Sequence, residues 1–342
     1  MVTRRYPKRC EESSRRCLEA CEPRAMSDDD LKLSLGDTRR ALKGVARSVL
    51  GPSAWRWLKT VTGRGPRRLP WSVLDATLDE AARAFAASEE AGRAYLSTVE
   101  FEVPIIDGDP FSPAFRDAQL RLYERIAGRA YRAKESETSR LSAAEVTRRP
   151  YPFSTGSSRV VGDYFTLLGF VLSTLDLEPG ATVIELGPGW GHTTRALLQV
   201  GCDVTAVEVD DGFAAALEGS GAKVVRADML EFTPSAPVDV VLFFESFHHA
   251  SDPVALLSRL VSWLAPGGLV CFAAEPIDSA FSMPWGVRLD GLSAWSIRRH
   301  GWLELGFRPD FFFELLDRAG LTGHRVRSPA HPDAQAIIAR RK

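Results

Sequence analysis

The residues of this chain best suited to chemistry follow a short apolar run near its middle. That segment reads Val183-Ile184-Glu185-Leu186-Gly187-Pro188-Gly189-Trp190-Gly191-His192-Thr193-Thr194. Glycine has no side chain and adopts backbone angles that other residues avoid, so Gly187, Gly189 and Gly191 allow a ligand to approach the backbone closely. The amides at the start of the helix expected next suit an anionic group, such as the carboxylate of a cofactor. The segment therefore predicts a strand, a ligand-binding turn and a helix.

Two acidic residues follow at the ends of the next two expected strands. Glu208 comes roughly 20 residues after Gly187, where a carboxylate accepts hydrogen bonds from both hydroxyls of a ribose. Asp228 ends the third strand, and with Met229 it is placed to flank an adenine, the acid accepting from the exocyclic amine and the methionine packing on the ring. The order of these features on consecutive strands predicts a site for an adenosine-containing cofactor.

A nicotinamide dinucleotide is the competing ligand for such a turn. Its fingerprint would place a third glycine where this chain has His192. The spacing therefore disfavours an NAD-dependent oxidoreductase, which is kept as an alternative.

A polar segment follows the expected strand 238–244 and reads Glu245-Ser246-Phe247-His248-His249-Ala250-Ser251-Asp252-Pro253. Ligands of parallel sheets bind at the carboxyl ends of the strands, so these side chains are candidates for catalysis. A histidine there can remove a proton from an acceptor, and we favour His249 as the base, with His248 as the alternate. Glu245, His248 and His249 could instead hold a divalent metal ion, although Mg²⁺ prefers oxygen ligands. Whether a metal is used stays open.

The elements that position these residues alternate regularly. Strand-like runs separated by helix-like stretches, such as 194–200 and 253–264, are expected at 182–186, 204–209, 223–226, 238–244 and 269–274. After a helix over 309–319, the runs 321–327 and 335–340 are joined by a short proline-containing link. We therefore predict an α/β fold, a Rossmann-like, doubly wound, mostly parallel seven-stranded sheet with an antiparallel last strand, preceded by an N-terminal helical appendage.

Over roughly residues 151–342 the sequence resembles the class I S-adenosylmethionine (SAM) dependent methyltransferases. The resemblance equates Glu185 and the three glycines with the acid and glycines of that family's first strand and turn, Glu208 with its ribose acid and Asp228 with its adenine-side acid. The segment that begins at Glu245 is similar to that of ubiquinone-type O-methyltransferases, which have a second glutamate at the position of His248.

The resemblance implies SAM as the cofactor and a methyl group transferred to an oxygen of a small polar acceptor, with nitrogen as the alternative. A glycan or a secondary metabolite is the acceptor class it suggests. Because the SAM-binding sheet is shared by enzymes of very different substrates, the acceptor itself is not predicted. A non-catalytic SAM-binding partner protein is the second alternative.

Composition divides the chain into three parts. Residues 1–70, rich in Arg, Ser, Gly and Pro, predict a basic arm without regular structure, within which Met26 is a possible translation start. Helical spacing of apolar residues predicts a helical appendage over 71–150, and 151–342 is the expected methyltransferase domain. Its insert 276–308 carries tryptophans and arginines suited to an acceptor lid, unless the tryptophans simply pack on the sheet.

The bulk composition excludes some partners. Lys and Arg total 43 against 44 Asp and Glu, so we do not expect nucleic acid as a partner. The five cysteines form no regular disulfide framework, which favours a reducing cytoplasm. No apolar run is long enough to span a bilayer, so no integral membrane association is expected. The oligomeric state is left open.

Overall fold

The computed structural model of the chain describes residues 67–342, apart from 103–105, 330, 332 and 333. The described residues all belong to one compact unit. Most of the predicted arm over 1–70 lies outside the described residues. Its last four residues are an exception, because Arg67–Pro70 form the short strand β1, which pairs in parallel with β2 (Val99–Glu102). Regular structure therefore begins slightly before the predicted boundary.

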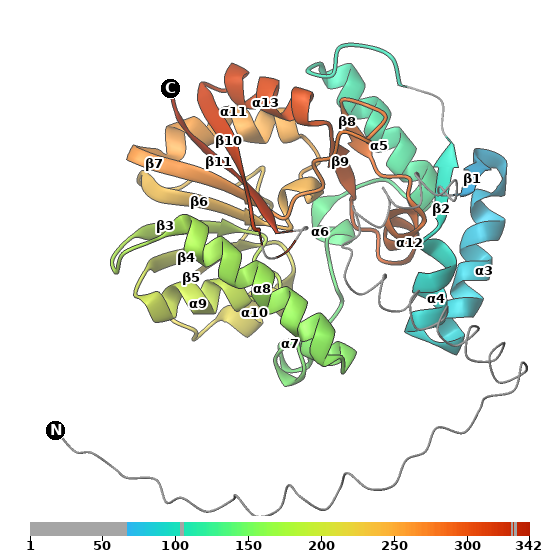
Figure 1. Cartoon of the computed structure of the whole chain (residues 1–342), viewed down its shortest axis with the longest axis horizontal. Coiled ribbons are helices and arrows are strands. Elements are labelled where there is room, and N and C mark those ends of the chain that lie inside the picture. Colours follow the sequence, from blue (N-terminus) through green and yellow to red (C-terminus); the bar gives the residue numbers. More distant parts are fainter. Residues whose placement is uncertain (1–66, 103–105, 330, 332–333) are drawn as a thin grey trace, which may run out of the picture. The chain divides into compact units, whose positions relative to one another are not determined.

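A seven-stranded sheet forms the core of the part of the chain over 158–341, with the appendage helices to one side of it (Figure 1). Its strand order is β10-β11-β7-β6-β3-β4-β5. The last strand, β11, is antiparallel to both its neighbours, and the others share one direction. The predicted fold class is confirmed, and β11 lies inside the sheet between β7 and β10. The bounds are β3 (Thr182–Leu186), β4 (Asp203–Glu208), β5 (Lys223–Arg226), β6 (Val238–Phe244), β7 (Leu264–Ala273), β10 (Leu321–Arg327) and β11 (Gln335–Arg341).

Helices cover both faces of this sheet (Figure 1). Alternate residues of a strand point to opposite faces, so Val183 of β3 packs with one hydrophobic cluster and Ile184 with the other. The helices of the first face are α8 (Ser158–Leu175), α9 (His192–Val200) and α10 (Asp211–Leu217). Those of the second face are α11 (Pro253–Trp263) and α13 (Pro309–Arg318). The doubly wound arrangement follows from this alternation.

Side-chain caps fix where the helices begin. The Ser157 hydroxyl accepts from the amide of Val160 at 3.3 Å at the start of α8, as expected for a capping serine. Asp210 caps α10, and Asp252 caps α11 with a proline in the next position. Because Asp210 and Asp252 come shortly after β4 and β6, these helices begin at the carboxyl edge of the sheet.

The N-terminal appendage and the insert 276–308 share one core. Helix α12 of the insert contacts α3, α4 and α5 of the appendage, and buried side chains from both, such as Leu78 and Ile297, belong to one cluster. The appendage contains α3 (Leu74–Ala87), α4 (Glu89–Leu96), β2, α5 (Pro113–Ala127), α6 (Ala133–Ser136) and α7 (Ala143–Arg148). The insert contains β8 (Trp285–Val287), α12 (Gly291–Arg299) and β9 (Leu305–Phe307).

Two tryptophans of the insert do not offer the free aromatic faces expected of an acceptor lid. Trp285 is 1% exposed and its indole nitrogen donates to the Pro110 carbonyl at 2.7 Å. Trp295 stacks on Phe85 of α3, with ring centroids 4.8 Å apart. The alternative of structural packing holds for both side chains, but they pack on the appendage rather than on the sheet.

Two further expectations concern membranes and cysteines. Within the described part of the chain, no helix is both long and apolar enough to cross a bilayer. Cys202 and Cys271 are free and buried. The other three cysteines, in the predicted arm, lie outside the described residues.

Gly212 tests the packing of α10 against the appendage. A Cβ atom there would lie 1.9 Å from the carbonyl oxygen of Leu141. We predict that Gly212→Ala lowers the free energy of unfolding by about 1–3 kcal/mol, because the backbone must move, although alanine is the better helix former. Gly162→Ala in α8 is the control, since its Cβ would have no neighbour within 4 Å, and it should stabilise by about 0.5–1 kcal/mol. Urea denaturation measures both, and equal effects would contradict the packing.

Candidate functional site

The glycine-rich turn joins β3 to α9, as predicted. Gly187 has φ +69° and Gly189 has φ +52°, angles that favour glycine. A Cβ at Gly187 would lie 2.9 Å from the Ser246 Cβ, so this glycine is required for packing against the segment after β6. A Cβ at Gly189 would have no atom within 4 Å. The turn is therefore packed at Gly187 and faces open space at Gly189, where a ligand can approach the backbone.

Glu185, in the strand before the turn, hydrogen-bonds to the helix after it. Its side chain is 1% exposed, and its carboxylate accepts a hydrogen bond from the Thr194 hydroxyl of α9. Burial raises the pKa of Glu185 to about 7, although the hydrogen bond from Thr194 opposes the rise. The carboxyl group thus ties the strand to the start of the helix.

Glu208 joins the glycine turn to the end of β4. Its carboxylate accepts from the amide of Gly189 at 3.0 Å and from the amide of Asp210 at 2.9 Å. Burial raises the pKa of Glu208 to about 7, while these two amides act in the opposite direction. A carboxyl group next to the open position at Gly189 has lone pairs left for the hydroxyls of a ligand.

Asp228 and Met229 lie beside the same turn. The Met229 methyl carbon is 3.9 Å from a Cβ placed on Gly187. Asp228 is half-buried and accepts from the Leu230 amide at 3.0 Å, and burial raises its pKa. The structure therefore brings together the four groups that the sequence assigned to a cofactor, namely the acid and glycines of the turn, Glu208, Asp228 and Met229.

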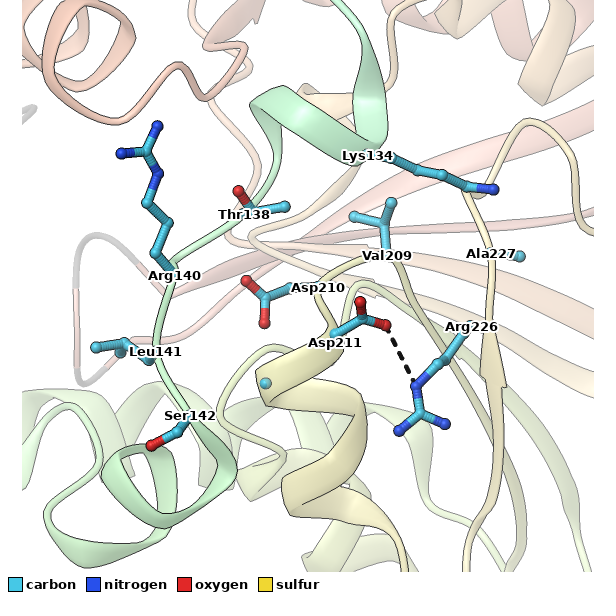
Figure 2. Close-up of a pocket in the computed structure, with 11 residues that line it drawn as sticks. Lys134, Thr138, Arg140, Leu141, Ser142, Val209, Asp210, Asp211, Arg226 and Ala227 are labelled. Atoms are coloured by element: carbon cyan, nitrogen blue, oxygen red, sulfur yellow. Dashed lines mark ion pairs between the residues drawn. The ribbon is translucent and has the colours of Figure 1, made fainter.

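A cavity of about 670 Å³ opens at the carboxyl ends of β4 and β5 (Figure 2). Val209, which directly follows Glu208, and Ala227, which directly precedes Asp228, line it. The volume lies in the range of small-molecule sites. In Figure 2 the appendage residue Thr138 faces the end of β4 across this cavity. Neither Glu208 nor Asp228 lines the cavity itself; each is one residue along the chain from a residue that does.

Residues 131–142 of the appendage, here called the strap, run along this edge of the sheet. The Ser139 hydroxyl donates to the Asp210 carboxylate at 2.9 Å, and the Leu141 carbonyl packs on Gly212. At its other end the Tyr131 hydroxyl donates to the carbonyl of His249 at 3.4 Å. The strap therefore reaches from the cavity to the second group of candidate residues.

That second group is organised by Glu275, which follows β7. One of its carboxylate oxygens accepts from the amides of Ser246 and Phe247 at 2.9 and 2.8 Å. The other accepts from the His248 amide at 3.2 Å and lies 2.8 Å from His248 Nδ1. Burial alone would raise the pKa of Glu275, but the charge of His248 and these hydrogen bonds hold it below its usual value. Glu275 thereby fixes the short 3-10 helix η3 (Phe247–His249).

His249 pairs with a carboxylate of the strap. Its Nδ1 lies 3.3 Å from Glu137, without hydrogen-bond geometry, and Glu137 also accepts from the Leu303 amide at 2.8 Å. Burial lowers the pKa of His249, but the charges of Glu137, Glu304 and Glu275 outweigh it and raise the pKa to about 9. At neutral pH the imidazole is therefore a cation and a hydrogen-bond donor, and it must lose a proton before it can act as the base favoured by the sequence.

Glu245 has φ +52° and directly follows β6. Among the described residues its carboxylate has no hydrogen bond and no ion pair, and its side chain is open to solvent. Glu245 is thus available to a ligand.

The metal alternative receives no support from this geometry. In the part of the chain that the structure describes, no three His, Cys, Asp or Glu side chains form a group that could hold a metal ion. His248 Nδ1 lies beside Glu275 and His249 Nδ1 beside Glu137, and the two imidazole rings are 4.2 Å apart.

The sequence did not identify Glu137 and Glu275 as site residues. Glu275 comes two residues after the end of β7, and this place at the carboxyl edge was the available signal. Glu137 belongs to the appendage, and nothing in its local sequence indicates a contact with His249. Tertiary packing alone places it there.

Comparison with known proteins identifies the second half of the chain. Residues 161–326 match the model of a methyltransferase domain family. An uncharacterised methyltransferase of Geobacillus kaustophilus is 34% identical over 125 residues, which are 35% of this chain and 56% of that protein. A trans-aconitate 2-methyltransferase of an Azoarcus species is 28% identical over 136 residues, which are 36% of this chain and 54% of that protein. The chain thus spans about half the length of these relatives.

A solved structure is also similar. The 1,6-didemethyltoxoflavin-N1-methyltransferase of Burkholderia thailandensis, crystallised with S-adenosylhomocysteine, is 18% identical to this chain with a TM-score of 0.41. The match covers 71% of this chain and 94% of that one.

The role of the buried Glu275 carboxylate can be tested through the stability of the protein. Glu275→Gln should lower the free energy of unfolding by about 2–4 kcal/mol, because the new amide group would point a donor at His248 and its amide. The pKa of Glu275 is depressed in the folded protein, so its contribution is present above the ordinary value of 4.5 and is lost as the pH falls through the folded pKa. The deficit of the variant should therefore shrink in acid.

Chemical denaturation at pH 7 and pH 4 measures this deficit. Glu314→Gln is the control, because Glu314 forms only a surface ion pair with Arg318 and should leave the midpoint unchanged. If Glu275→Gln is as stable as the wild type at pH 7, the Glu275 carboxylate does not stabilise η3.

Proposed function

We propose that this chain, whose residues 161–326 match a methyltransferase domain family, is a class I SAM-dependent methyltransferase that transfers a methyl group from SAM to an oxygen of a small polar acceptor, with nitrogen as the alternative. One observation carries the proposal: the glycine turn with Glu208 and the segment with Glu245 lie at the same edge of the sheet. They touch where Gly187 packs on Ser246. A cofactor bound at the turn would thus end beside the charged groups after β6.

The residues of the turn fit the methyl donor. SAM supplies a methyl group already activated on a positively charged sulfur. Glu208 would accept from the ribose hydroxyls, and Asp228 with Met229 would flank the adenine. The open backbone at Gly189 supports the close approach that this placement requires.

The residues after β6 and β7 would handle the acceptor. A methyl transfer requires the nucleophile to be aligned with the methyl group and freed of its proton. His249, cationic at neutral pH, would donate a hydrogen bond to the acceptor, and Glu245 would accept one. The assignment of His249 as the base stays a prediction, since its pairing with Glu137 opposes loss of its proton.

The wider organisation is part of the proposal. Residues 151–342 would form the methyltransferase domain, and the appendage 71–150 with the insert 276–308 would cover the acceptor. Their shared core supports this, because α12 packs on the appendage helices. The two buried cysteines support a reducing compartment such as the cytoplasm.

Titration calorimetry with S-adenosylhomocysteine and with NADH tests the cofactor. We expect micromolar binding of the former alone, and loss of that binding in Glu208→Ala, because the ribose would lose its acceptor. Glu80→Ala is the control, since Glu80 is exposed and pairs with Arg83 within helix α3 of the appendage. Binding of NADH instead, or wild-type affinity in Glu208→Ala, would refute the assignment.

The raised pKa of Glu208 makes this binding pH-dependent. Ribose hydroxyls donate to the ionised carboxylate, so the ligand prefers the deprotonated form. Affinity for S-adenosylhomocysteine should therefore fall as the pH drops through about 7, the pKa of Glu208, toward a limiting loss of roughly tenfold per pH unit. Glu208→Gln should lose this dependence while retaining weak binding. The same pH profile in wild type and variant would assign the titration to another group.

A further inference from the structure

The cavity at the carboxyl ends of β4 and β5 has walls from two distant parts of the chain (Figure 2). Val209 and Ala227 lie on the sheet side, directly after the two strands. Thr138 and Leu141 belong to the strap, and Thr138 faces the end of β4. The appendage therefore supplies part of the wall, opposite the strand ends.

The sheet side of this wall is continuous with the residue proposed to hold the ribose. The Ala227 amide donates to the Glu208 carbonyl at 3.2 Å. One carboxylate oxygen of Glu208 accepts from the amide of Asp210, which lines the cavity, and the other accepts from the amide of Gly189 in the glycine turn. Glu208 thus lies between the turn and the cavity. A cofactor with its ribose on Glu208 and its methionine end on the turn would direct its adenine toward the cavity.

The strap is anchored on both sides of Thr138. The Ser139 hydroxyl donates to the Asp210 carboxylate at 2.9 Å. On the other side, the Glu137 carboxylate accepts from the Leu303 amide at 2.8 Å. Because both neighbours of Thr138 are held by side-chain hydrogen bonds, Thr138 cannot leave the cavity unless one of these contacts breaks. The packing of the appendage therefore fixes its place opposite the end of β4.

The Thr138 side chain has unused hydrogen-bonding capacity. It is half-buried, and within the described part of the chain its hydroxyl forms no hydrogen bond. The hydroxyl is not among the described polar atoms that are buried without a partner, so it is open to the cavity that Thr138 lines. A hydroxyl both donates and accepts, and an adenine offers ring nitrogens that accept and an amino group that donates. Thr138 can therefore contact either kind of group.

We propose that the strap forms the outer wall of the cofactor site and that Thr138 contacts the adenine of bound SAM. This inference rests on the function proposed above and extends its cofactor site to the N-terminal appendage. The cavity volume of about 670 Å³ accommodates a nucleoside base, since small-molecule sites have volumes of this order. Residues 161–326, which match the methyltransferase family, do not include this wall. Cofactor binding by this chain therefore depends on the strap.

Thr138→Trp in the full-length protein tests the assignment, because the indole would occupy the space proposed for the adenine. By titration calorimetry we expect the variant to bind S-adenosylhomocysteine at least tenfold more weakly than the wild type, roughly the effect of losing the contacts of one buried group. Thr147→Trp is the matched control, since Thr147 is exposed on α7 and does not line the cavity. It should bind with wild-type affinity.

A nuclear Overhauser measurement on the wild type tests the same contact without relying on the folding of a variant. With isotope-labelled threonine methyl groups, the saturated complex with S-adenosylhomocysteine should show transfer between the Thr138 methyl group and the C–H protons of the adenine. The methyl signal that is missing in Thr138→Ser identifies Thr138. The Thr147 methyl group should show no transfer.

The outcomes separate this inference from the proposed function. Wild-type affinity in Thr138→Trp, or no transfer to the Thr138 methyl group in a saturated complex, would overturn the role of the strap and leave the proposed function in place. Absence of S-adenosylhomocysteine binding in the wild type would overturn the proposed function, and the inference with it.

Discussion

The site depends on the buried carboxylate of Glu275, which accepts hydrogen bonds from backbone amides in the segment after β6. Glu275 accepts from three successive amides, those of Ser246, Phe247 and His248, and also contacts the His248 ring. These amides belong to a turn that would otherwise bury unpaired donors, at a cost comparable to the hydrogen bonds themselves. With the turn fixed, the Phe247 ring enters the core and the charged side chains on either side remain at the sheet edge. Every role proposed for Glu245 and His249 requires this turn to hold its shape.

At the candidate cofactor site, a buried carboxylate likewise accepts hydrogen bonds from backbone amides. Glu208 accepts from amides of the glycine turn and of the segment before α10, so one carboxylate again joins two loops that are distant in sequence. The strap then links both halves, since it contacts Asp210 through Ser139 and lies beside His249 through Glu137. Displacement of the strap would therefore affect cofactor and acceptor residues together. This connection gives the appendage a direct part in the site.

The sequence predicted the fold class and the groups around the glycine turn because these depend on local patterns. Strands β3, β5, β6 and β10 have the predicted bounds, since alternating apolar runs and glycine breaks are local signals. The environment of the acceptor residues was not predictable in the same way. Glu137 reaches His249 only through the packing of the appendage, and Trp285 is buried by contacts with a segment far away in sequence. Consequently, the charge of His249 and the isolation of Glu245 became visible only once the insert and appendage were placed.

A crystal structure of the full-length protein with S-adenosylhomocysteine tests the central claim most directly. We predict that both ribose hydroxyls lie within hydrogen-bond distance of Glu208, roughly 2.6–3.2 Å, with the adenine beside Asp228 and Met229 and the sulfur directed toward Glu245. A ligand bound away from the glycine turn, or a ribose without contact to Glu208, would contradict the account.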